Sequence, residues 1–105
     1  MKISTTETIA GCKIIETVGI AKGTVVQSKN IGRDILAGFK TIVGGEIAGY
    51  TDMLRQAREI ATERMIEDAK KMNADAIVSV RYGSSSVMDG SAEIIAYGTA
   101  VKIKE

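Results

Sequence analysis

The chain has 105 residues, with 14 basic and 13 acidic side chains and a formal net charge of +1. That length fits one domain, residues 1–105, and the balanced charge gives no electrostatic reason to expect nucleic acid as a partner. No apolar run is long enough to span a bilayer, and the N-terminus lacks the apolar core of a signal peptide. The single cysteine excludes an internal disulfide, so we expect a soluble, cytoplasmic protein.

The first third of the chain predicts strands. A short strand is expected over Lys2–Thr5, followed by a turn at Gly11. The β-branched stretch Cys12–Val18 favours a second strand. We interpret Gly19–Gly23 as a hairpin bend or a bulged bend, with Thr24–Ser28 as the return strand.

A shorter helix is predicted next. Asn30 is a good N-cap, and apolar residues recur behind it at helical spacing as far as Val43. The pair Gly44-Gly45 ends this helix, because glycine adopts the left-handed conformation common beyond a C-terminus. The link that follows is too short to separate two domains.

The stretch Tyr50–Met72 predicts one long helix, about 34 Å from end to end. Arg64 and Asp68 project from its apolar stripe one turn apart, where they can form an ion pair. Asn73 is a plausible C-cap. The stripe itself consists of residues at steps of three and four, namely Tyr50, Met53, Leu54, Ala57, Ile60, Ala61, Met65, Ala69 and Met72.

The C-terminal third predicts a β-hairpin. Asp89-Gly90 favours a type I′ turn, which pairs Met88 with Ser91 and, further along, Val78 with Val101. In that register one face is apolar and suited to the long helix. The side chains of the other face are small and mostly uncharged, so we expect this face to pack against another subunit. The alternative is a neutral face that is exposed to solvent. Its small residues are Ser79, Gly83, Ser85, Ala92, Ala96, Gly98 and Ala100.

Several segments from Ile9 onward together resemble the YbjQ-like family of small bacterial and archaeal proteins, which are labelled as heavy-metal-binding domains. The resemblance implies a dodecin-like α+β fold with a β-α-β-β core, in which an antiparallel sheet packs on one long and one shorter helix. It also implies a ring-shaped homo-oligomer, a homopentamer, in which short extra strands join neighbouring subunits. The segments that carry it are Asn30–Asp34, Ile42–Gly45, Gly49-Tyr50, Ala57–Glu59 with Ala61, Ala69, and Met72–Val78.

The loop between the two helices is the candidate ligand site. Bare backbone N–H groups before a helix N-terminus can hold a small anion, although a glycine pair can equally do no more than end a helix, with Arg33 and Asp34 pairing with a neighbouring subunit. The residues we assign to this site are Arg33, Asp34, Gly44, Gly45, Glu46 and Tyr50.

Metal and enzyme chemistry have little support in the sequence. The chain has no His and one Cys, so it lacks the ligand set that zinc or copper selects. Cys12, placed in the second strand, is a weak metal candidate if it clusters around a ring axis, and otherwise a small buried hydrophobe. No nucleophile, P-loop or dinucleotide motif occurs, and no cofactor is required. We therefore expect a non-enzymatic oligomeric binding or scaffold protein. The alternative is a small-anion or metal-binding protein that uses the inter-helix loop or the ring axis.

Overall fold

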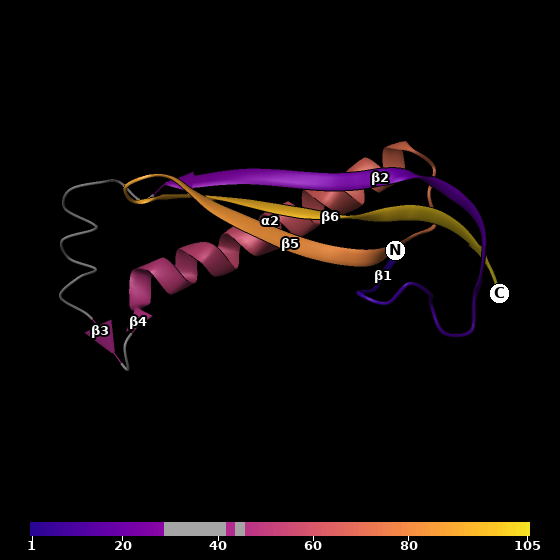
Figure 1. Cartoon of the computed structure of the whole chain (residues 1–105), viewed down its shortest axis with the longest axis horizontal. Helices are drawn as coiled ribbons and strands as arrows, with labels where there is room; N and C mark the ends of the chain where they lie inside the picture. The colour runs from indigo at the N-terminus through magenta and orange to yellow at the C-terminus, as the bar shows by residue number, and fades with distance from the viewer. Residues whose placement is uncertain (29–41, 44–45) are drawn as a thin grey trace.

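The computed structural model of the chain describes residues 1–28, 42–43 and 46–105. Within them it confirms the α+β class: one long helix packs on a four-stranded mixed sheet of order β1-β5-β6-β2, with β1 parallel to β5 (Figure 1). The dodecin-like core and the ring stay predictions. The elements are β1 (Lys2–Ile3), β2 (Lys13–Ser28), β3 (Ile42–Val43), β4 (Glu46–Ile47), α2 (Ala48–Lys71), β5 (Ala76–Met88) and β6 (Ser91–Lys104).

β2 is one continuous strand of 16 residues, where the sequence predicted two strands and a bend. The bend over Gly19–Gly23 is wrong, because this stretch pairs with Ala96–Ala100 of β6 in unbroken antiparallel register. The two register irregularities of β2 both lie before Gly19. Gly23, one of the two glycines that suggested a turn, serves packing instead, since a Cβ there would lie 2.4 Å from the backbone nitrogen of Met65 in α2.

α2 confirms the long helix predicted over Tyr50–Met72 and begins two residues earlier. The predicted C-cap is also present, because Asn73 has a left-handed φ of 62°. The Asn73 N–H donates to the carbonyl of Lys70 at 3.0 Å, and the Ala74 N–H donates to that of Ala69 at 3.1 Å. These two bonds form a Schellman motif, which satisfies carbonyl groups left free at the end of the helix.

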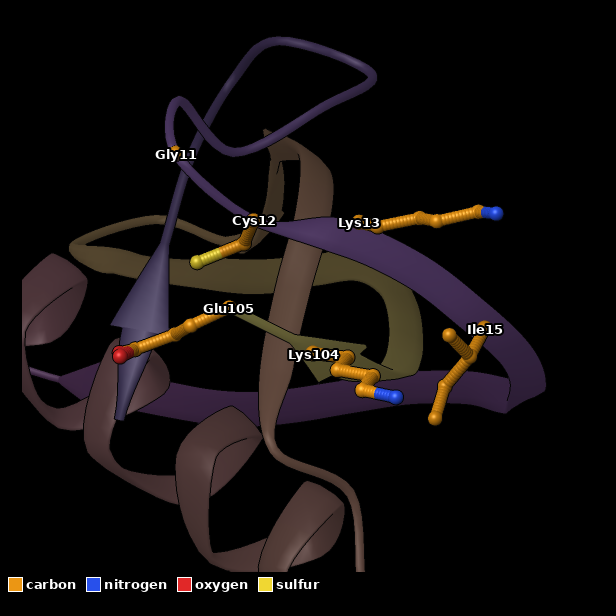
Figure 2. A pocket seen from close by; sticks show the side chains of 6 residues that line it. All are labelled: Gly11, Cys12, Lys13, Ile15, Lys104 and Glu105. Carbon is orange, nitrogen blue, oxygen red and sulfur yellow. The ribbon is translucent and has the colours of Figure 1, made fainter.

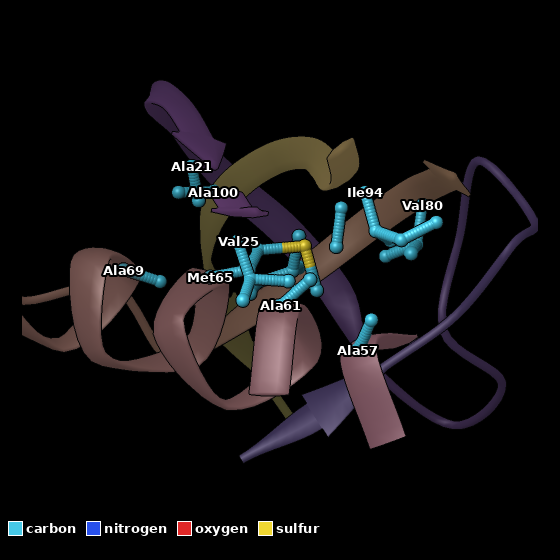
Figure 3. Close-up of a cluster of buried hydrophobic side chains, with 11 residues drawn as sticks. Ala21, Val25, Ala57, Ala61, Met65, Ala69, Val80, Ile94 and Ala100 are labelled. Carbon is cyan, nitrogen blue, oxygen red and sulfur yellow. The ribbon is translucent and has the colours of Figure 1, made fainter. Parts of the chain in front are cut away.

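The buried positions of α2 recur at every fourth residue and lie against one face of the sheet, which we call the helix face. Most of them are alanines, so the helix backbone approaches the strands closely. Figure 3 shows Met65 and Ala61 directed at Val25 of β2, inside the main buried cluster. The buried positions of the helix are Met53, Ala57, Ala61, Met65 and Ala69.

Arg64 and Asp68 bond to the backbone of β2 rather than forming the predicted ion pair with each other. The Arg64 guanidinium donates to the carbonyl oxygen of Thr24 at 2.7 Å, and an Asp68 carboxylate oxygen accepts from the Lys22 N–H at 3.0 Å. Among the described residues β2 is an edge strand, and no other strand pairs with its outward N–H and C=O groups. Both side chains bond to the strand edge instead of to each other because the edge presents a fixed N–H donor and a fixed C=O acceptor.

The final hairpin turns at the predicted place, with Met88 opposite Ser91. The predicted type I′ geometry is wrong: it needs positive φ at both turn residues, and in this turn only Gly90 has one, at 78°. The register beyond the turn also differs, because β5 contains two irregularities. Val78 consequently lies opposite Thr99, not Val101.

In β6 the two faces are reversed relative to the prediction, whereas Val80 of β5 faces the helix as predicted. Ala96 and Ala100 of β6 belong to the buried cluster under α2, and Gly98 is buried beside Ile77 and Val80 of β5. An alanine-rich helix approaches a strand most closely where the strand carries small side chains. The small-residue face therefore meets protein as predicted, but the protein is the chain's own helix and not a neighbouring subunit.

The N-terminal segment lies along the outer edge of β5. The N–H groups of Ser79 and Val80 donate to the carbonyls of Thr6 and Ser4, each at 2.9 Å. Ser79 has a left-handed φ of 54° at the irregularity between Val78 and Arg81. The Arg81 guanidinium donates to the Thr5 carbonyl at 3.0 Å, so side chain and backbone together hold this segment against the irregular part of β5.

The shorter helix predicted after Asn30 lies almost entirely outside the described residues. Its last two predicted residues, Ile42 and Val43, form the strand β3 instead. β3 pairs antiparallel with β4, with Val43 opposite Glu46. These two short strands form a sheet separate from the four-stranded one.

Candidate functional site

The sheet face directed away from α2, which we call the outer face, carries exposed apolar side chains. In β2 the residues Ala21, Gly23 and Val25 turn to the helix, so the alternate residues turn outward. Ile20 is 69% exposed and Val26 is 56% exposed. Both side chains are too exposed to contribute much to the stability of a single chain.

β6 continues this apolar surface at the centre of the sheet. Tyr97, opposite Lys22, is 41% exposed, and Ile95, opposite Thr24, is half-buried. The four side chains lie on four successive cross-strand rows of one face, so that Ile20 neighbours Tyr97 diagonally and Ile95 neighbours Val26 in the same way. The exposed Lys22 and Thr24 lie between Ile20 and Val26 on β2. We call Ile20, Val26, Ile95 and Tyr97 the outer-face patch.

One end of the outer face is covered by the chain itself. A second buried cluster holds Val78 and Val101 together with the partly buried Ile9 of the N-terminal segment. The N-terminal segment therefore covers the end of the sheet near the C-terminus of β6. The outer-face patch lies beyond it, toward the hairpin turn, and no described residue forms a layer over it.

Sequence reasoning missed the outer-face patch because it split β2 at Gly19–Gly23. A continuous strand through this stretch alternates small residues with larger ones, and that period of two assigns Ile20 and Val26 to one face. The alternation was visible in the sequence. The glycines, which usually mark a turn, obscured it.

A surface pocket of about 620 Å³ lies where β2 begins and β6 ends (Figure 2). Lys13 and Lys104 stand directly opposite each other in the register, an arrangement that like charge disfavours. Cys12 is half-buried and lies just before β2, not in a strand as predicted, and the ammonium group of Lys2 is 3.8 Å from its sulfur. The lining residues are Gly11, Cys12, Lys13, Ile15, Lys104 and Glu105.

Most residues of the predicted inter-helix site lie outside the described part of the chain. Arg33, Asp34, Gly44 and Gly45 lie outside the described residues. Glu46 belongs to β4. Tyr50 is half-buried in the first turn of α2. The assignment of a small-anion site to these residues stays a prediction.

A search of the described residues finds no group of three or more His, Cys, Asp or Glu side chains that could hold a metal ion. The whole chain contains one Cys and no His. Heavy metals prefer thiolate and imidazole ligands, so the residues placed here do not fit a heavy-metal centre within one chain. In the same part of the chain, no helix combines the length and the apolar character needed to cross a membrane.

Comparison with known proteins gives the family. A family model described as "Putative heavy-metal-binding", the YbjQ family, matches residues 1–104. The chain belongs to this family. Its relatives include UPF0145 proteins from Pseudothermotoga lettingae, 59% identical over 105 residues that cover 100% of this chain and 99% of the relative, and from Vibrio campbellii, 59% identical over 103 residues that cover 98% and 99%.

The fold is shared with a solved structure. A crystal structure of a DUF74-family protein of unknown function from Pediococcus pentosaceus matches with a TM-score of 0.68 at 18% identity, covering 99% of this chain and 98% of that one. At that identity the match shows the fold alone. The names of these relatives state no enzymatic activity, and the YbjQ family description is a label that the described residues of this chain do not by themselves support.

Proposed function

We propose that this YbjQ-family protein is a self-assembling, non-enzymatic binding or scaffold protein, a ring of five subunits being the arrangement that the family resemblance implies. The observation that carries the proposal is the outer-face patch. A strand side chain such as Ile20, 69% exposed, contributes little to the folding of one chain. A second copy that covers the patch supplies the buried environment that these side chains lack.

The free energy gained by burying the outer-face patch is large enough to contribute to association. Burying an exposed Ile or Val side chain contributes about 2 kcal/mol, and the patch holds the exposed Ile20 and Val26, the half-buried Ile95 and one tyrosine. Association costs at least several kcal/mol in lost translational and rotational freedom. Four side chains at the centre of a larger contact can offset that cost, as clustered anchor residues do in other interfaces.

Light scattering on wild type and two single variants tests the proposal. Ile20→Asp places a charge in the patch and should raise the dissociation constant by roughly 30-fold or more, equivalent to about 2 kcal/mol. Ile15→Asp is the matched control, because Ile15 lies in the same strand, is 57% exposed and is outside the patch. Equal particle mass for the two variants at every concentration would contradict the proposal.

Small-anion or metal binding is the second candidate function. The observation in its favour is the pocket that contains Cys12, Lys13 and Lys104. Elemental analysis and native mass spectrometry of the protein purified from its own host test it. A metal or small molecule in a fixed ratio to the chain supports this second candidate. If neither is found, the second candidate is contradicted.

A further inference from the structure

The outer-face patch is symmetric in the order of its rows. Along β2, Ile20 stands in the first row of the patch and Val26 in the last, and the two rows between them hold first Tyr97 and then Ile95 of β6. Successive rows on one face of a sheet are about 7 Å apart. The apolar side chains are therefore evenly spaced about a midpoint between Tyr97 and Ile95.

Resting on the proposed self-assembly through this patch, we infer that the patch is covered by the same face of a second copy, related by a two-fold axis that crosses the strands between Tyr97 and Ile95. An axis in this direction places each strand over its own counterpart and reverses the order of the rows. Ile20 of each copy then meets Val26 of the other copy, and Tyr97 meets Ile95. Two sheets stacked face to face lie about 10 Å apart, so all four side chains gain apolar neighbours.

The strand β5 leaves room for this contact. Gly83 lies in a row next to the axis and faces Arg81 of the second copy, where the absent side chain gives the guanidinium space. Ser85, one row further out, faces Val78 of the second copy, which Ile9 of the N-terminal segment covers. The smallest residues of β5 on this face thus lie opposite the part of the second copy that its own chain makes thicker.

Charged side chains of the outer face favour this direction of the axis. Lys22 and Arg81 flank Tyr97 in one row, and Glu93 lies two rows away. The ion pairs in the described part of the chain join residues of α2 only. The axis across the strands brings Glu93 within about one row of Lys22 and Arg81 of the second copy, a distance that long side chains can bridge. An axis running along β6 would instead place Lys22 over Arg81 of the second copy, and such like-charge contacts are costly.

Mixing complementary variants tests the orientation. Ile20→Asp and Val26→Lys each place a charge against an apolar side chain of the second copy, so each variant alone should associate at least about tenfold more weakly than wild type in sedimentation velocity. Mixed in equal amounts, the two variants should associate at least about tenfold more tightly than either alone. The reason is that a mixed pair contains one carboxylate–ammonium contact and one unchanged contact between Ile20 and Val26.

The matched control is a mixture of Ile20→Asp with Tyr97→Lys. Tyr97 belongs to the same patch, but in the inferred orientation its row lies two rows, about 14 Å, from the position of the aspartate of the second copy. This mixture should therefore recover no association. Recovery in the first mixture alone supports the contact, whereas recovery in neither mixture, or equal recovery in both, overturns it.

The failure of this contact is distinguishable from the failure of the proposed function. A wild-type protein that sediments as a single chain contradicts self-assembly itself. A wild-type assembly that Ile20→Asp weakens and Val26→Lys does not restore contradicts only the orientation. A two-fold contact joins copies in pairs, so a ring of five would use a further surface of the chain.

Discussion

Gly23 of β2 lies directly beneath Ala61 of α2: a Cβ added at Gly23 would stand 2.2 Å from the Ala61 carbonyl oxygen. A strand backbone and a helix backbone thus touch without a side chain between them. Because neither backbone can move without displacing the whole element, this contact fixes the depth at which α2 lies on the sheet.

Gly23→Ala should therefore destabilise the protein strongly. The added methyl group meets backbone atoms and cannot be relieved by a rotamer change, so we expect a loss of at least about 2 kcal/mol in the free energy of unfolding. Gly19→Ala is the control, because its Cβ would meet only the Met72 sulfur, at 3.6 Å, an ordinary contact. Urea denaturation of both variants checks this. Similar midpoints for the two would refute the close approach.

Asp68→Ala should lower stability and expose the edge of β2. It removes the acceptor of the Lys22 N–H, which we expect to cost about 1 kcal/mol. The Lys22 amide should also exchange its hydrogen faster with solvent. Glu67→Ala is the comparison, since Glu67 makes only an exposed contact to Lys70 at 3.8 Å and should change stability by less than about 0.5 kcal/mol. Equal effects at both positions would mean that the edge contact contributes nothing.

Replacing Asn73 by glycine should preserve stability, whereas replacing it by alanine should lower it. Its left-handed φ of 62° costs an ordinary L-residue about 1 kcal/mol or more, while glycine adopts it freely. Asn73→Gly should leave the thermal unfolding midpoint unchanged or raise it, and Asn73→Ala should lower it. If alanine proves as stable as glycine, the Schellman cap described here is absent in solution.

Thiophilic metals should bind this protein only through Cys12. The chain has one Cys and no His, and its described residues contain no cluster of three candidate ligands. Titration with Cd²⁺, followed by the thiolate charge-transfer absorbance, should give at most one ion per chain for wild type and no signal for Cys12→Ser. Cd²⁺ that stays with the Cys12→Ser chain through gel filtration, measured by elemental analysis, would contradict this prediction.

The sequence predicted the elements that depend on local chemistry. The period of α2, the cap at Asn73 and the pairing of Met88 with Ser91 all follow from side-chain spacing and turn residues. What it could not predict depends on tertiary packing. Gly23 is a contact point rather than a bend because Ala61 and Met65 of α2 lie against it, and nothing near Gly23 in the sequence distinguishes the two roles.

The choice of the buried face of β6 failed for a similar reason. Larger apolar residues looked suited to the long helix, but α2 presents mainly alanines and therefore packs on the small residues Ala96, Gly98 and Ala100. Of the candidate ligand site, Glu46 is placed in β4 and Tyr50 in α2. The outer-face patch was overlooked because it requires β2 to be continuous.

Sedimentation velocity of the wild-type protein, from low to high micromolar concentration, tests the central claim most directly. A protein whose outer-face patch is covered by a second copy should sediment as a defined species several times heavier than the 11.2 kDa chain, with the mass falling on dilution if the contact is weak. A single boundary at the mass of one chain across the whole range would contradict the account, because Ile20, Val26 and Tyr97 would then be exposed in solution.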